Sequence, residues 1–146
     1  MSRYLTSESR TIPADAQTLF DIVADPAMHP VIDGSGSVQA VRGAATRLAN
    51  GSSFGMDMKI GAPYKITNTV VEFEEGRVIA WRHFNGHVWR YLFEPAGDGS
   101  TTKVTEQWDL RPVWNRALLK LTFGGRTKKA LSATLTRLGE VAAERR

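Results

Sequence analysis

The chain contains no cysteine and no long apolar run. Without cysteine, its 146 residues form no disulfide bond and carry no thiolate nucleophile, which is compatible with a reducing compartment. The N-terminal stretch MSRYLTSESRTI lacks the apolar core of a secretory signal peptide, and no later segment approaches the roughly 20 apolar residues that span a bilayer. These absences predict a soluble, cytoplasmic protein without a membrane span.

Motifs for metal binding, nucleotide binding and serine hydrolysis are also missing. The three histidines, His29, His83 and His87, do not have the spacing of metal ligands. There is no GxSxG motif, Walker loop or dinucleotide fingerprint, and the run DGSGS at residues 33–37 does not follow a strand as a phosphate loop does. The sequence therefore predicts no metal and no cofactor.

Positive charge is concentrated at the C-terminal end. From Arg111 to Arg146, nine Lys or Arg residues stand against Glu140 and Glu144, a net charge of +7, so the first 110 residues carry −3 of the total of +4. A solvated face opposite an apolar stripe accounts for this distribution. The alternative is binding of an acidic partner, nucleic acid or a membrane surface, and of these nucleic acid is not the expected partner.

Length and pattern together predict a single domain over residues 1–146. The chain shows no repeat, low-complexity block or linker, and its length suffices to bury a core. A strand is expected over residues 4–12, followed by a helix that begins after Pro13 and is broken at Pro26. A short helix or turn and a strand over residues 37–42 come next.

In the middle of the chain, apolar and polar residues alternate as in antiparallel strands. The dipeptide Asn85-Gly86 between two such runs is a strong signal for a two-residue hairpin loop. A later strand, TKVTEQWDL, places Val104, Glu106 and Trp108 on its inner face. The two-residue loop sets a register in which eight residues share one face: Phe84 opposite His87, Arg82 opposite Trp89, Ala80 opposite Tyr91, and Val78 opposite Phe93.

The last element reads as one amphipathic helix from about Pro112 to the C-terminus. Its apolar positions recur in steps of three, four and seven. Gly124 and Gly125 interrupt it, although each glycine weakens a helix by about 1 kcal/mol relative to alanine. We expect Gly125 to lie on the buried face and to leave room for a ligand, unless the pair breaks the helix with a positive φ. The predicted buried stripe is Trp114, Leu118, Leu121, Gly125, Lys128, Leu131, Leu135, Leu138 and Ala142.

The complete pattern predicts an α+β protein in which the long helix lies across the concave face of an antiparallel sheet. The segments IPADAQTLFDIVADPAMHPVIDG, VIAWR and WRYLFEPAGDGSTTKVTEQW, together with the terminal helix, resemble the START-like SRPBCC superfamily. This resemblance covers nearly the whole chain and is closest to the proteins called polyketide cyclase/dehydrase or lipid-transport-like. It implies the helix-grip fold: a curved seven-stranded antiparallel sheet wrapped around the C-terminal helix, with two short helices after the first strand.

The resemblance also implies a hydrophobic cavity between sheet and helix, which family members use to bind lipids, hormones or aromatic polyketides and, in a minority, for catalysis. We therefore expect a small hydrophobic or aromatic ligand, either lipid or polyketide-like. A cyclase or dehydratase enzyme is one alternative, and a regulatory or toxin-like interaction protein that uses the basic helix is another. The residues expected to bind the ligand are Met56, Met58, Arg82, Trp89, Tyr91, Phe93, Glu106, Trp108, Leu121 and Gly125.

A polar cluster is expected among these residues. Glu106 lies between apolar residues on the proposed inner face, where an unpaired carboxylate is costly, so it needs a partner. Arg82 and Tyr91 are the candidates in the predicted register. Three roles are open: a buried structural ion pair, orientation of the ligand, or acid-base catalysis by a Glu106 whose pKa is shifted by burial. The opposite face is then lined by Ile79, Trp81, Val88 and Leu92, which a homodimer contact would cover.

Overall fold

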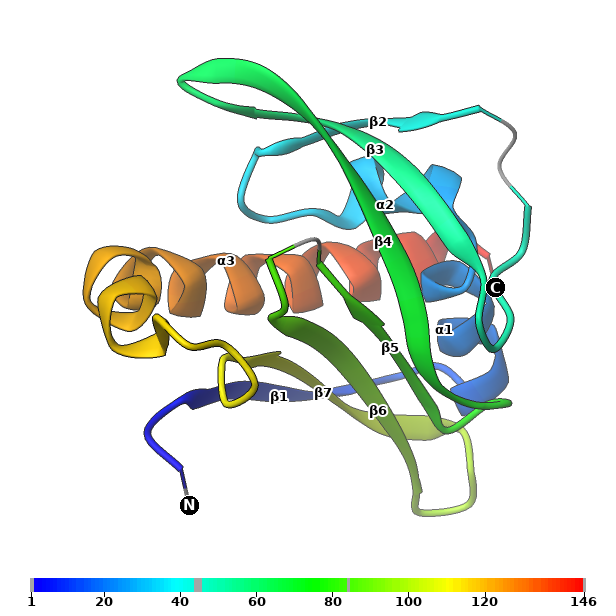
Figure 1. Ribbon diagram of the computed structural model, residues 1–146. Coiled ribbons are helices and arrows are strands. Elements are labelled where there is room, and N and C mark those ends of the chain that lie inside the picture. Colours follow the sequence, from blue (N-terminus) through cyan, green and yellow to red (C-terminus); the bar gives the residue numbers. More distant parts are fainter. Residues whose placement is uncertain (1, 44–45, 84, 146) are drawn as a thin grey trace.

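The computed structural model of the chain is a sheet curved around a long helix (Figure 1). It describes residues 2–43, 46–83 and 85–145. Within them, seven strands form one antiparallel sheet in the order β1-β7-β6-β5-β4-β3-β2, which confirms the predicted α+β helix-grip fold. The elements in chain order are β1 (Leu5–Ile12), α1 (Ala16–Val23), the 3₁₀ turn Pro26–Met28, α2 (His29–Ile32), β2 (Val38–Arg42), β3 (Ser53–Ile60), β4 (Ala62–Glu74), β5 (Val78–Arg82), β6 (Val88–Ala96), β7 (Thr101–Asp109) and α3 (Arg116–Glu144).

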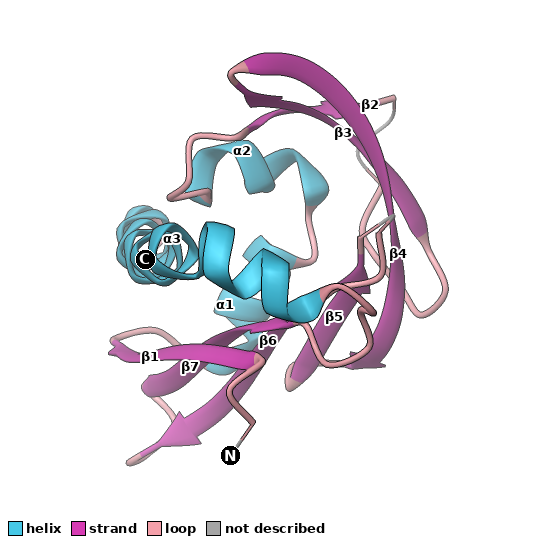
Figure 2. Ribbon diagram, turned by 60° about the vertical axis from the view of Figure 1, so that its left-hand side comes forward, coloured by secondary structure: helices cyan, strands magenta, loops and turns pink. Residues whose placement is uncertain are grey.

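Helix α1 fills one end of the concave face. Its N-cap residue Asp15 accepts hydrogen bonds from the backbone N–H and the hydroxyl of Thr18, at 3.1 and 2.6 Å. This cap satisfies an N–H group that has no partner inside the helix. On the inner side of α1, Phe20 meets Phe73 and Phe93 edge-on, with ring centroids 5.5 Å apart in each pair. Figure 2 shows both short helices within the curve of the sheet.

The pairing of β5 with β6 differs from the predicted register by one residue. Trp81 lies opposite Trp89, where the sequence predicted Arg82. The hairpin closes one residue earlier than a two-residue loop allows, because the backbone N–H of His83 donates to the carbonyl of His87 at 2.8 Å. The dipeptide signal identified the turn correctly but gave the wrong loop length.

This shift moves the side chains of β5 to the other face, because successive residues of a strand alternate. Ile79 and Trp81 lie inside the curve of the sheet and are 0% and 8% exposed, so their predicted place on the outer face is wrong. Val88 and Leu92 alternate with the inward residues of β6 and remain outside. Half of the apolar surface that motivated a homodimer is therefore internal, and the dimer stays a prediction. The predicted partner Phe84 lies outside the described residues.

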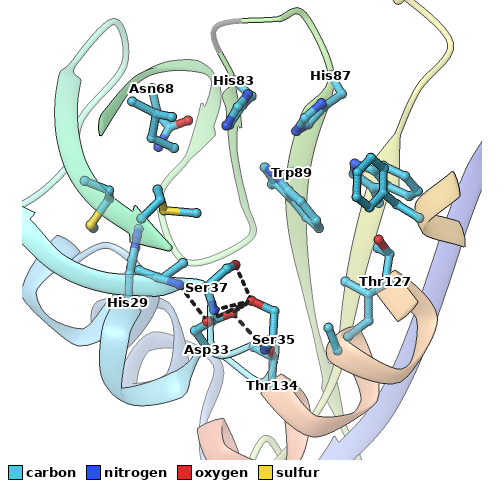
Figure 3. Close-up of a pocket in the computed structure, with 18 of the residues that line it drawn as sticks. His29, Asp33, Ser35, Ser37, Asn68, His83, His87, Trp89, Thr127 and Thr134 are labelled. Atoms are coloured by element: carbon cyan, nitrogen blue, oxygen red, sulfur yellow. Dashed lines mark hydrogen bonds between the residues drawn. The ribbon is translucent and has the colours of Figure 1, made fainter. Parts of the chain in front are cut away.

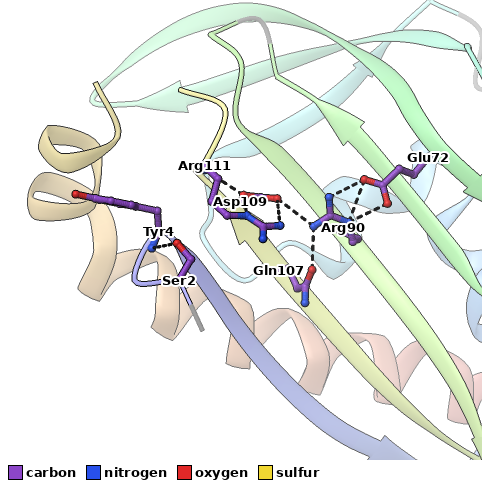
Figure 4. A network of polar contacts seen from close by, with 7 residues as sticks. All are labelled: Ser2, Tyr4, Glu72, Arg90, Gln107, Asp109 and Arg111. Atoms are coloured by element: carbon purple, nitrogen blue, oxygen red, sulfur yellow. Dashed lines mark hydrogen bonds and ion pairs between the residues drawn. The ribbon is translucent and has the colours of Figure 1, made fainter. Parts of the chain in front are cut away.

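A partly buried arginine, Arg90, organises the convex face at this point (Figure 4). The guanidinium of Arg90 donates to Glu72 through Nε and Nη2, at 3.0 and 2.6 Å, and to Gln107 through Nη1 at 2.9 Å. Glu72 pairs with Ala80, and Ala80 pairs with Arg90, so the guanidinium spans the small side chain of the intervening strand. Asp109, 3.3 Å from Arg90, joins the same network. An alanine at this position of β5 is what lets the three neighbouring strands share one arginine.

The C-terminal half of α3 buries the stripe that its sequence predicts. Leu131, Leu135, Leu138 and Ala142 are at most 1% exposed. Leu135, Leu138 and Ala142 continue the apolar core that the sheet and α1 share, and Leu131 lines the adjoining cavity. Burial of such leucine side chains stabilises a fold by roughly 1.5–3 kcal/mol each. This half of the helix is the anchored part.

The N-terminal half of the predicted stripe is wrong. Trp114, Leu118 and Leu121 are 90%, 61% and 84% exposed. From Leu131, steps of four toward the N-terminus lead to Thr127, Phe123 and Leu119, and these side chains face the sheet. The sequence favoured steps through Lys128 and Gly125 instead because they reach more apolar residues. The complete buried set within the helix is Thr127, Leu131, Thr134, Leu135, Leu138 and Ala142.

The two adjacent glycines of α3 are helical and do not thin the helix over the interior. Neither Gly124 nor Gly125 has a positive φ. A Cβ placed on Gly125 meets nothing within 4 Å, and one placed on Gly124 meets only the side chain of Lys120, at 3.7 Å. The expectation that Gly125 lies on the buried face is therefore wrong. The close approach is at Gly34 instead, where a Cβ would lie 2.5 Å from the carbonyl oxygen of Ala130.

These two glycines predict opposite effects of alanine. Gly125→Ala should raise the free energy of unfolding by up to about 1 kcal/mol, because the helix gains propensity without a clash. Gly34→Ala should lower the free energy of unfolding by about 1–3 kcal/mol, because the new Cβ forces the loop between α2 and β2 away from the backbone of α3. Urea unfolding midpoints measure both, and a destabilised Gly125→Ala variant would contradict the helical placement.

Candidate functional site

A cavity of about 330 Å³ lies between the concave face of the sheet and α3 (Figure 3). It reaches the surface at Ile60, Asn85 and Arg126, which are exposed. Residues from every element between α2 and β7, and from the part of α3 between Leu119 and Thr134, contribute to its wall. The lining is His29, Ile32, Asp33, Ser35, Ser37, Val38, Met56, Met58, Ile60, Tyr64, Ile66, Asn68, Trp81, His83, Asn85, His87, Trp89, Tyr91, Glu106, Trp108, Leu119, Phe123, Arg126, Thr127, Ala130, Leu131 and Thr134.

Aromatic rings form rigid walls on two sides of the cavity. Trp81 stacks on the imidazole of His29, with centroids 4.7 Å apart and planes 20° from parallel, and lies 5.7 Å from the ring of Tyr91. Trp89 and Trp108 stack at 6.0 Å on neighbouring strands. Such rings expose flat apolar faces with few rotatable bonds, so a flat ligand can pack on them with little loss of side-chain entropy.

Four polar atoms of the lining are buried without a hydrogen-bond partner in the described part of the chain. They are the Oδ1 of Asn68, the Nδ1 of His87, the Oε1 of Glu106 and the Nε1 of Trp108. A buried polar atom without a partner costs roughly 1–3 kcal/mol. All four belong to residues that line one cavity, so a ligand bound there can form the missing hydrogen bonds.

The carboxyl group of Glu106 has Tyr91 beside it. The two residues are direct partners across β7 and β6, as the sequence predicted, and their side chains share the inner face. Burial raises the pKa of Glu106 to about 8, a hydrogen bond from Tyr91 opposes this rise, and the negative charge of Asp33 adds to it. At neutral pH the carboxyl therefore keeps its proton. Burial also raises the pKa of Tyr91 well above its usual value.

The predicted pairing of Arg82 with Glu106 is wrong. Arg82 lies opposite Thr69 and Val88 and its side chain is exposed, because the one-residue register shift turns it away from the interior. Glu106 avoids an unpaired buried charge by protonation rather than by an ion pair.

Two histidines of the cavity are held in the neutral form. Burial lowers the pKa of His29 to about 4, although its Nε2 lies 2.8 Å from the carbonyl oxygen of Val23. Burial, and then the positive charge of His83, lowers the pKa of His87 to about 3. Together with the protonated Glu106, these groups make the deep part of the cavity polar but uncharged at neutral pH.

The loop between α2 and β2 forms the wall that faces α3. The carboxylate of Asp33 accepts hydrogen bonds from the N–H of Ser35 at 3.1 Å and from the N–H of Val38 at 3.0 Å, which folds the loop on itself. The N–H of Gly34 donates to the hydroxyl of Thr134 at 2.8 Å. The run DGSGS is therefore a turn that binds α3 through Gly34, and the carboxylate of Asp33 is used in hydrogen bonds within the turn.

Six of the ten residues predicted to bind a ligand line the cavity, and four do not. Phe93 is buried in the adjacent core, and Arg82, Leu121 and Gly125 lie outside the cavity wall. The six that line it are Met56, Met58, Trp89, Tyr91, Glu106 and Trp108.

Several residues of the wall escaped the sequence analysis. The alternation of β4 carries a signal for Asn68, because it lies in step with Ile66 and Val70 on the inner face. His29 carries no such signal, since it reaches the cavity only through the fold of α2 against the sheet. Among the described residues, no group of three or more His, Cys, Asp or Glu side chains is arranged to hold a metal ion. In the same residues, no helix combines the length and the apolar character needed to cross a membrane.

A curved antiparallel sheet that grips a C-terminal helix across an apolar cavity defines the helix-grip class of proteins. The chain belongs to the polyketide cyclase/dehydrase and lipid transport family, whose profile matches residues 5–143.

Similar proteins are consistent with this assignment. The chain is 40% identical over 104 residues to an uncharacterized protein of Mycobacterium tuberculosis, a match that covers 70% of this chain and 46% of that protein. The chain thus matches less than half the length of this relative. Protein Ms6760 from Mycobacterium smegmatis superposes with a TM-score of 0.74 at 14% identity, covering 98% of this chain and 93% of that one. The di-domain ARO/CYC StfQ from the steffimycin biosynthetic pathway gives 0.65 at 14% identity, covering 97% and 51%. These structural likenesses show a shared fold.

The proton on Glu106 predicts a specific pH dependence of stability. The folded protein keeps this proton up to about pH 8, whereas the unfolded chain releases it near the ordinary value of 4.5. The free energy of unfolding should therefore fall as the pH rises through this window, by up to about 1.4 kcal/mol per unit. Glu106→Gln cannot ionise and should remove this slope.

Urea unfolding between pH 6.5 and 8 isolates the effect, because His29 and His87 act below their ordinary pKa of 6.5 and with the opposite sign. Glu94→Gln, at an exposed glutamate of β6, is the matched control. Parallel curves for wild type and Glu106→Gln would show that the carboxyl is ionised in the folded protein.

Proposed function

We propose that the chain binds a small, uncharged, mainly aromatic molecule in the cavity between the sheet and α3. The observation that carries this proposal is the convergence of four partnerless polar atoms on one aromatic cavity. Membership of the polyketide cyclase/dehydrase and lipid transport family supports a ligand of this kind. A ring system with hydroxyl or carbonyl groups, as in polyketides, matches this wall better than an unsubstituted hydrocarbon does.

The protonation states of the wall favour a neutral ligand. Glu106, His29 and His87 are all uncharged at neutral pH because burial disfavours their charged forms. An anion brought into this interior would lose its hydration, find no counter-charge on these three groups and be repelled by the carboxylate of Asp33. The volume of about 330 Å³ lies at the lower end of the roughly 300–1,000 Å³ of small-molecule sites, which favours a ligand of a few rings over a long acyl chain.

An enzymatic role of the cyclase or dehydratase type is the alternative that a specific observation favours. A protonated carboxyl beside a tyrosine hydroxyl in a buried, uncharged part of a cavity is an arrangement that suits a general acid. Glu106 would then donate its proton to a hydroxyl group of the bound molecule, so that the C–O bond breaks and water leaves. The resulting carboxylate would take the proton lost from the adjacent carbon as the double bond forms, which restores the carboxyl group. The two functions separate in Glu106→Gln, which should retain binding in a carrier and lose turnover in an enzyme.

Two flavones that differ only in their hydroxyl groups test the proposed ligand chemistry. Apigenin carries hydroxyl donors that flavone lacks, so it should bind more tightly and raise the melting temperature further. Asn68→Leu removes the buried acceptor Oδ1 while it keeps the side chain's size. It should weaken apigenin binding by up to about tenfold and leave flavone binding nearly unchanged.

Met58→Leu serves as the control, because it alters the cavity wall without altering hydrogen bonding and should affect both flavones equally. Isothermal titration calorimetry gives the affinities, and thermal unfolding gives the shifts. The proposal fails if the melting temperature is unchanged by apigenin, by flavone and by a panel of fatty acids of similar size. The cavity is then not a binding site for such molecules.

A further inference from the structure

Three large apolar side chains are exposed together at the start of α3. Trp114, just before the helix, is 90% exposed, and Leu118 and Leu121 on its first turns are 61% and 84% exposed. We call these three residues the exposed stripe. They make up half of the large apolar side chains that are exposed in the described part of the chain. Single exposed leucines need no explanation, but a cluster of three with a tryptophan indicates a contact surface.

The sequence segment that contains the exposed stripe carries charge of one sign. Between Leu110 and Gly139 the sequence contains no Asp or Glu. Lys128 and Arg111 have carboxylate partners, Glu8 at 3.9 Å and Asp109 at 2.8 Å. No described carboxylate lies within 4.0 Å of the other five cations of this segment. The seven cations are Arg111, Arg116, Lys120, Arg126, Lys128, Lys129 and Arg137.

The exposed stripe lies at the end of the molecule where the cavity reaches the surface. Leu119 and Phe123, on the same turns of α3, line the cavity, and Arg126 lines its rim. Tyr64 on β4 lines the cavity across the rim from Arg126. The two groups are close enough to interact, because, while burial raises the pKa of Tyr64, the positive charge of Arg126 lowers it. Ile60, at the tip of the β3–β4 hairpin, is also exposed at 43% and lines the opening.

We propose that the exposed stripe docks on the anionic surface of a lipid bilayer. A segment that presents a Trp just before a helix and Leu side chains on its first turns, among lysines and arginines, has the composition that inserts apolar side chains at the level of the lipid headgroups. The cations face the phosphates, and docking sets the opening of the cavity beside the bilayer. This inference does not depend on the identity of the ligand in the cavity.

A second copy of the chain fits the exposed stripe less well. In a symmetric dimer the same surface meets itself, so the cations of one segment would face those of its partner without a carboxylate between them. Like charges in such a contact repel, whereas an anionic bilayer neutralises them.

Vesicle co-sedimentation tests the proposal with the whole chain. Wild type should bind vesicles of equal parts phosphatidylcholine and phosphatidylglycerol, bind phosphatidylcholine vesicles weakly, and lose binding as the salt concentration rises. The triple variant Trp114→Ser, Leu118→Ser, Leu121→Ser should have an affinity for the anionic vesicles at least about tenfold lower. Lys129→Gln should reduce binding by about fivefold.

Two matched variants control for general effects of these changes. Val71→Ser alters an exposed valine on β4, and Lys103→Gln removes an exposed charge on β7, so neither should alter vesicle binding. Absence of binding to the anionic vesicles would overturn the proposal, as would equal binding by wild type and the triple variant. Gel filtration adds a third test: dimerisation of wild type that the triple variant abolishes would assign the exposed stripe to a second copy instead.

Discussion

The contact between Gly34 and the C-terminal half of α3 fixes the rotation of that helix, and the site depends on it. Gly34 has no room for a side chain, because its backbone packs directly against the backbone of the helix near Ala130 and Thr134. Its N–H is bound by Thr134, and Arg137 binds the carbonyl oxygen of Asp33. With this half held, the helix must continue in one orientation. Its first turns then place Leu119 and Phe123 over the cavity and the exposed stripe toward solvent.

The interior of the cavity is polar without being charged, which is the less costly way to bury these groups. An ionised Glu106 would need a cation, and Arg82 lies on the other face of β5. Holding the proton on Glu106 and leaving His29 and His87 neutral avoids a charge on each of these three buried groups. The remaining cost is that of unmet hydrogen bonds, which a bound molecule can form.

The sequence determined the fold more completely than it determined the site, for a physical reason. Element order, the strand period and the apolar face of the C-terminal half of α3 each extend over many residues, so single ambiguities do not change the result. The inward face of β5 depended on one loop length, and an error of one residue exchanged Trp81 for Arg82. Ala80 lies between Glu72 and Arg90, and their hydrogen bond across it is compatible with only one register of β5. This contact can be recognised only once the neighbouring strands are known.

The phase of α3 was ambiguous for a related reason. Two stripes pass through Leu131, one by Lys128 to Gly125 and Leu121, the other by Thr127 to Phe123. The first contains more apolar side chains, so the assumption that large apolar residues are buried favours it. That assumption fails where an apolar side chain serves an intermolecular contact, because local hydrophobicity does not distinguish a core from a docking surface.

Gly124 and Gly125 lie where the anchored half of α3 meets the half that covers the cavity. They neither leave room for a ligand nor break the helix, so their main physical effect is to lower its local stability by about 1 kcal/mol each relative to alanine. The turns before them have few buried contacts of their own and are therefore the least stable part of the helix. Leu118 and Leu119 are adjacent on these turns, one facing solvent and the other the cavity. Whatever binds the outer face of this segment therefore acts on the cavity wall through the same backbone.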